Sequence, residues 1–63
     1  MDKLEKAEAR RIYEDAAIAM DNLASIVTEC TTGEYISKRY IREKIKNVEY
    51  AVDFIKGMVD DAE

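Results

Sequence analysis

The sequence predicts an all-helical protein, an antiparallel two-helix hairpin whose apolar faces are closed by further copies of the same chain. The first reason is that apolar residues recur at spacings of three and four in two long segments. The second is that the chain has no proline, and glycine occurs only at positions 33 and 57. An amphipathic pattern with so few breakers is typical of α-helices. We therefore expect residues 1–63 to form a single helical domain.

The first helix is expected over about residues 2–30. Its apolar residues follow one another three and four positions apart, which gives the 3.5-residue repeat of a bundle or coiled-coil seam. Cys30 closes this seam and is interpreted as a small apolar side chain, because the chain has no histidine that could activate its thiol. The seam consists of Ala9, Ile12, Ala16, Ala19, Leu23, Ile26 and Cys30.

The second helix is expected over about residues 35–60. Its many β-branched residues would suit a strand, but they do not alternate with polar residues as a half-buried strand requires. Gly57 costs about 1 kcal/mol relative to alanine inside a helix, so we expect fraying after it. The repeat is carried by Ile41, Ile45, Val48, Val52, Ile55 and Val59. Ala51, Phe54 and Met58 are expected to widen this apolar face.

A short turn at residues 31–34 should connect the two helices. Gly33 is expected to end the first helix in a left-handed conformation. Thr31 and Glu34 fit the spacing of a capping box for the second helix, and Ser37 is a second candidate cap. Because the connection is short, the helices should be antiparallel neighbours.

The length of the chain predicts self-association. A monomer this short buries only about 60% of its unfolded surface and needs a stabilising staple. One cysteine cannot form an intramolecular disulfide, and a chain without histidine makes a poor zinc site. We expect no metal and no cofactor. A partner chain is therefore the expected staple, and well-packed helices within one chain are the rival explanation. A homodimer closing as a four-helix bundle is the simplest form, and a larger helical oligomer is the alternative.

Composition narrows the function. The carboxylate pairs Glu14-Asp15 and Asp60-Asp61 are interpreted as solvated helix faces, so the chain is not expected to be an enzyme. No apolar run reaches the roughly 18 residues of a membrane span, and residues 1–6 lack the apolar core of a signal peptide. A cytoplasmic location is expected, where a free thiol is stable. The net charge of −4 makes DNA an unfavourable ligand.

The charge distribution points to a candidate binding site. Residues 34–46 hold five cations and two glutamates, a net charge of +3, where the dipole of the second helix is also positive. An anionic group could be held there by cations, hydroxyl groups and aromatic rings. The alternative is that these cations pair with acids at neighbouring helix ends, such as Asp2, Glu5, Asp60 or Asp61. The candidate residues are Thr32, Tyr35, Lys38, Arg39, Tyr40 and Arg42.

A second possible contact surface surrounds Ile18, which the helical repeat places off the seam and between acidic residues. Asn22 and Ser25 follow it one turn later, and Tyr50 could join the same surface. The alternative is that Ile18 is a single exposed apolar residue, as is common on protein surfaces.

The sequence therefore predicts a small non-enzymatic interaction protein, a regulator or inhibitor that binds itself and a macromolecular partner. One alternative is an oligomer that sequesters an anionic, nucleotide-like ligand at sites made from the turn and the Lys38–Lys46 stretch. A third is an RNA-binding helical bundle of the copy-control type, because chain length and hairpin plan are similar to those of plasmid-encoded RNA-binding hairpin dimers. No motif in the residues themselves favours that third alternative.

Overall fold

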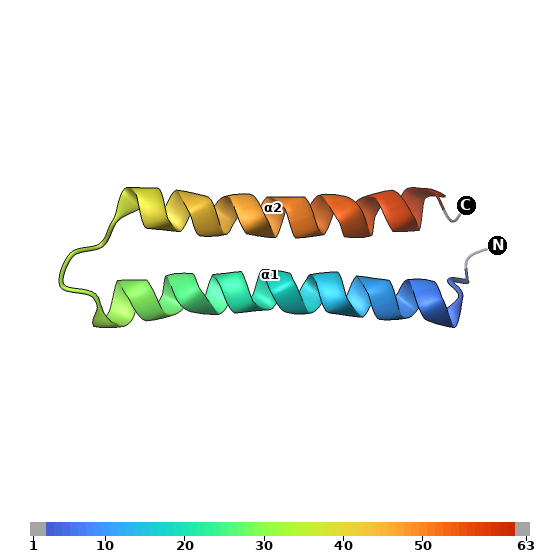
Figure 1. The fold of residues 1–63 in the computed structure, drawn as a ribbon, viewed down its shortest axis with the longest axis horizontal. Helices are drawn as coiled ribbons and strands as arrows, with labels where there is room; N and C mark the ends of the chain where they lie inside the picture. The colour runs from blue at the N-terminus through green and yellow to red at the C-terminus, as the bar shows by residue number, and fades with distance from the viewer. Residues whose placement is uncertain (1–2, 62–63) are drawn as a thin grey trace.

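The fold is a hairpin of two long antiparallel helices. The computed structural model describes residues 3–61, and side chains for residues 3–60. It contains α1 (Lys6–Thr32) and α2 (Lys38–Asp61), with no strand in the described range. Figure 1 shows the helices side by side, with the connection at one end and both chain termini at the other. The predicted all-helical hairpin is confirmed.

The start of α1 lies at Lys6, some residues later than the expected position of about 2. The backbone N–H of Glu5 donates to the carboxylate of Glu8, at 3.0 Å. Glu5 is the residue before α1 and Glu8 lies in its first turn, so this hydrogen bond caps the start of the helix. The negative charge of Glu8 is also favoured beside the positive end of the helix dipole.

The end of α1 differs from the prediction. Thr31 and Thr32 belong to the helix, and their hydroxyl groups donate to the carbonyl oxygens of Val27 (2.8 Å) and Thr28 (2.7 Å). Thr31 therefore does not cap α2, and the predicted capping box with Glu34 was wrong. Gly33 follows in an extended conformation, with φ −78° and ψ 135°, so the left-handed glycine was also wrong.

The connection covers residues 33–37, slightly later than the expected 31–34. Ser37 begins α2, because its hydroxyl oxygen accepts the backbone N–H of Tyr40 at 3.2 Å. The second candidate cap is thereby confirmed. Fraying was expected after Gly57, but the helix runs through this glycine to Asp61 without interruption.

The contact between the helices is narrow. Among the described side chains only Ala19 and Ala51 are buried, and these small residues face each other's helix. The side chains of Leu23 and Val52, both expected in the core, are 49% and 48% exposed, and Cys30 is also exposed. The reason is that a hairpin gives each helix one neighbour, which covers less than the width of these apolar faces.

The elongated shape and large accessible surface of the molecule also show that few side chains are buried. The molecule measures 49 × 16 × 13 Å, with a radius of gyration of 14.6 Å. A compact chain of this length would have a radius of about 10.6 Å. Its accessible surface is 5519 Å², whereas a compact monomer of this mass exposes about 4,100 Å². The hairpin thus leaves about 1,400 Å² more surface exposed than a compact monomer would.

Candidate functional site

The hairpin has two opposite faces that can be distinguished by helical geometry. Ala19 and Ala51 mark the line where the helices meet, and consecutive residues differ by about 100° around a helix. Ile18 and Tyr50, each one residue earlier, line the same hollow and so lie on one side of the hairpin. The residues that follow the two alanines, Met20 and Val52, must therefore lie together on the other side.

The side with Met20 and Val52 is here called the apolar face. Seven-residue spacing places Tyr13 with Met20 on α1, and Ile45 and Val59 with Val52 on α2. Of the large apolar side chains of this face, Ile41, Val48 and Ile55 are half-buried. The others are 44–69% exposed. The face has no charged residue at its repeat positions, which are Ala9, Tyr13, Ala16, Met20, Leu23, Val27 and Cys30 on α1 and Ile41, Ile45, Val48, Val52, Ile55 and Val59 on α2.

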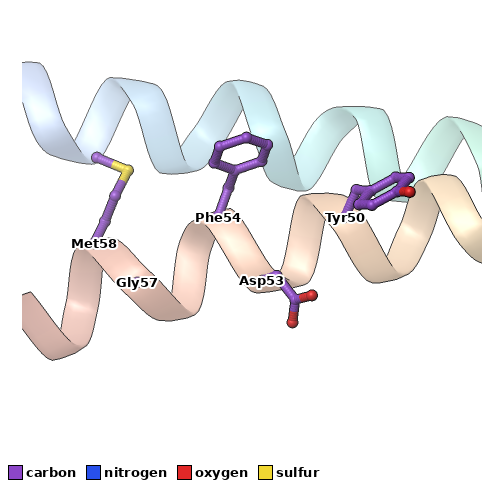
Figure 2. Close-up of a pocket in the computed structure, with 5 residues that line it drawn as sticks. All are labelled: Tyr50, Asp53, Phe54, Gly57 and Met58. Carbon is purple, nitrogen blue, oxygen red and sulfur yellow. The ribbon is translucent and has the colours of Figure 1, made fainter.

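The opposite side carries two adjoining hollows, of about 410 and 250 Å³, that share Tyr50 and Phe54. Together they are here called the aromatic hollow. Figure 2 shows Tyr50, Phe54 and Met58 on the side of α2 nearer to α1, with Asp53 pointing away from that helix. The hollow is lined by Asp15, Ile18 and Asn22 from α1 and by Asn47, Tyr50, Ala51, Asp53, Phe54, Gly57 and Met58 from α2.

Two features give the aromatic hollow its chemistry. Its apolar lining is partly exposed, with Tyr50 at 58% and Phe54 at 62%. Among the described residues, the charged side chains that line it are both aspartates, Asp15 and Asp53. The hollow is open at Gly57, since a Cβ atom added there would have no neighbour within 4 Å. The result is an apolar recess with an acidic border.

A polar link between the helices lines the same hollow. The side-chain amide of Asn47 donates to the amide oxygen of Asn22, at 3.0 Å. Asn22 in turn donates its own amide to the carbonyl oxygen of Ile18, at 2.8 Å. The two bonds fix the orientation of Asn22, and they hold this region of α1 in register with α2.

The candidate basic site is dispersed around the connection. The hydroxyl of Thr32 donates to the carbonyl oxygen of Thr28 within α1. Tyr35 is 93% exposed in the connecting segment. Tyr40 is half-buried, with the Lys44 ammonium 5.2 Å from its ring centre. Lys38 is exposed at the first position of α2. None of these four residues lines the aromatic hollow or the hollow at Arg39 and Arg42.

Two of the six candidates do come together. Arg39 and Arg42 line an open hollow of about 340 Å³ with Ile45, and the other lining residues are Glu43, Lys46 and Glu49. Arg39 also approaches Glu43, with 3.8 Å between nitrogen and oxygen. Three cations and two carboxylates give this hollow a local net charge of +1.

The proposed pairing of these cations with acids at the helix ends has a geometric limit. Glu5 and Asp60 lie at the open end of the hairpin, whereas the basic stretch begins α2 at the connection (Figure 1). With 24 residues, α2 is about 36 Å long. Pairing of Lys38 or Arg39 with Glu5 or Asp60 would therefore need a second chain. Asp2 and the side chain of Asp61 lie outside the described parts.

The second contact surface suggested by the sequence overlaps part of the aromatic hollow. The structure brings together Ile18, Asn22 and Tyr50, while Ser25 donates its hydroxyl to the carbonyl oxygen of Asp21 and does not line the hollow. Phe54 was expected to widen the core face and instead lies on this opposite side. The missed signal was the four-residue spacing of Tyr50 and Phe54, which places two rings on one side of α2.

Protein-family models, curated proteins and solved structures give no significant match to this chain. In the part of the chain that the structure describes, no three acidic or cysteine side chains gather as metal ligands would. Neither of the two described helices is long and apolar enough to cross a membrane.

Proposed function

We propose that this chain is a non-enzymatic interaction protein whose hairpins associate through the apolar face into a homodimeric four-helix bundle. In this form it regulates or inhibits a macromolecular partner by binding it. The observation that supports the proposal is an apolar face without charged residues on both helices, in a protein with a net charge of −4. Surfaces of this kind mark binding sites in soluble proteins.

The exposed area matches what a dimer requires. A standard interface buries about 800 Å² on each partner, and obligate homodimers bury more. The hairpin exposes about 1,400 Å² beyond the surface of a compact monomer. Pairing two apolar faces would bury part of this surface and would give each helix a second neighbour for its apolar side.

The charge of the assembled protein favours a partner with a basic surface. Two chains of net charge −4 would carry −8 together, and the apolar faces that they bury contribute none of it. Acidic surfaces steer association toward positive ones and suppress binding to acidic partners. The mixed charge of the hollow at Arg39 and Arg42 gives an anionic ligand or RNA no comparable support.

Sedimentation equilibrium of the full chain across the micromolar range tests this proposal. We expect twice the 7.2 kDa chain mass. Val27→Asp places a charge on the apolar face and should give monomers, whereas Thr28→Asp adds the same charge to the adjacent, outward-facing position and should stay dimeric. A wild-type monomer at all concentrations would contradict the proposal, and a mass of four or more chains would replace the dimer with a larger oligomer.

A further inference from the structure

We propose that the aromatic hollow is the docking site for a cationic amphipathic helix of a partner protein. This inference rests on the proposed function as a binding protein and gives the partner its chemistry. It uses a surface distinct from the apolar face, so the two can be tested separately.

The aromatic hollow stays accessible when the apolar faces pair. Ile18 and Tyr50 lie on the opposite side of the hairpin from Met20 and Val52, as the positions around Ala19 and Ala51 require. A bundle closed through the apolar face would therefore leave the hollow on its outside. Aromatic and methionine side chains are enriched at protein interfaces, and Tyr50, Phe54 and Met58 supply three of them here.

The length of the hollow suits a helix. Its lining on α2 extends from Asn47 to Met58, which is about 16 Å along the helix axis. An amphipathic helix that docks in a groove uses apolar anchors at positions i, i+3, i+4 and i+7, which span about 10 Å. Two to three turns of such a helix fit within the hollow, with its anchors against Ile18, Tyr50 and Phe54.

The charge at the border selects the partner. Asp15 comes from α1 and Asp53 from α2, so a docked helix would meet a carboxylate from each helix of the hairpin. In the described part of the chain neither aspartate forms an ion pair. The side chain of Asp53 is exposed and that of Asp15 is half-buried. Lysine or arginine beside the apolar anchors would complement them.

A second copy of this chain fits the hollow less well. A two-fold contact places the same patch on both sides of the interface, so it would bring Asp15 and Asp53 of one chain toward those of the other. Like charges across an interface disfavour association. The apolar face has no such charges at its repeat positions and is the better surface for self-association.

The probe for this proposal is a pair of designed helical peptides, each about 18 residues long and with leucine at positions i, i+3, i+4 and i+7. One carries lysine at its polar positions and the other glutamate. Fluorescence anisotropy of labelled peptide measures binding to the full chain. We expect the lysine peptide to bind, with weaker binding at high salt, and the glutamate peptide not to bind.

Matched variants locate the binding. Phe54→Ala removes an anchor ring and should weaken binding at least tenfold. Asp15→Asn with Asp53→Asn should weaken it severalfold, whereas Asp21→Asn with Asp60→Asn, which changes the net charge equally on the same two helices, should not. Gly57→Leu should fill the hollow and reduce binding at least tenfold, and Gly57→Ala controls for the change in helix propensity.

Three results would overturn the proposal. Equal loss of binding in the two double variants would show attraction by net charge alone. Unchanged binding in both Phe54→Ala and Gly57→Leu would place the peptide elsewhere. A lower assembly mass in Phe54→Ala, measured by sedimentation, would assign the hollow to a second copy. Failure of the proposed dimer is seen separately, as a monomeric wild type, and leaves the peptide results unchanged.

Discussion

The two glycines differ in what surrounds them. Gly57 lies in the middle of the last turns of α2, where a Cβ atom would meet nothing within 4 Å. At Gly33 the same atom would lie 2.7 Å from the carbonyl oxygen of Glu29, which accepts the backbone N–H of Gly33 itself. Neither glycine has a positive φ, so backbone conformation does not distinguish them. They differ in the space around the Cα atom.

Substitution by alanine should therefore change stability in opposite directions. We expect Gly57→Ala to raise the free energy of unfolding by about 1 kcal/mol, because alanine is the better helix former and meets no obstacle. Gly33→Ala should lower it by about 0.5–3 kcal/mol, because the carbonyl group of Glu29 or the connection must shift. Urea unfolding followed by circular dichroism measures both, and a gain at Gly33 would contradict this account.

Ser37 is the residue on which the start of α2 depends. Its hydroxyl oxygen accepts the N–H of Tyr40, so Ser37→Ala should cost about 0.5–2 kcal/mol. Ser25→Ala is the matched control, because that hydroxyl donates to a carbonyl oxygen within α1 and replaces no missing backbone bond. Equal losses at the two serines in urea unfolding would show that Ser37 does not cap the helix.

At the scale of the elements, the sequence predicted both helices but misjudged how they meet. The period of three and four identified each helix, because it reflects the width of an apolar face and needs no knowledge of neighbours. The end of α1 was misplaced because threonine can cap a following helix or bond back to its own, and Thr31 does the latter. Local sequence does not decide between the two.

The aromatic hollow was predictable only in part. Ile18 stood out because it interrupts the polar side of its helix, whereas Phe54 was hidden within a broad apolar pattern. The side of the hairpin on which Phe54 lies depends on which residues of α2 face α1. The buried small residues Ala19 and Ala51 mark that contact. A pattern within one helix does not contain this rotation, which only packing against the neighbouring helix determines.

The bond between Asn22 and Asn47 gives a test of the observed rotation and register. A double-mutant cycle with Asn22→Ala and Asn47→Ala should give a coupling free energy of about 0.5–1.5 kcal/mol, with the low end favoured at this exposed site. A cycle of Asn47→Ala with Thr28→Ala, whose hydroxyl bonds within α1, should give none. Absence of coupling in the first cycle would mean that the helices meet in another register.

At the scale of the whole molecule, the hairpin separates its surfaces by chemistry. One side offers apolar residues without charge, the other an aromatic recess with carboxylates, and the connection carries mixed charges. Among the described side chains only two alanines are buried, which is too little apolar burial to hold 63 residues in place against their conformational entropy. Stability of the helices and assembly of the chains should therefore be coupled.

Leu23 makes this coupling measurable. The hairpin alone leaves its side chain 49% exposed, so Leu23→Ala should cost less than the roughly 2–5 kcal/mol expected at a buried site if the chain is monomeric. In the proposed dimer the full loss should appear, and the melting temperature of the variant should depend more steeply on protein concentration. Asp21→Ala, on the outer side of the same turn, should change stability by no more than about 0.5 kcal/mol. Thermal unfolding at several concentrations distinguishes these cases, and a small, concentration-independent loss at Leu23 would mean that the apolar face remains uncovered.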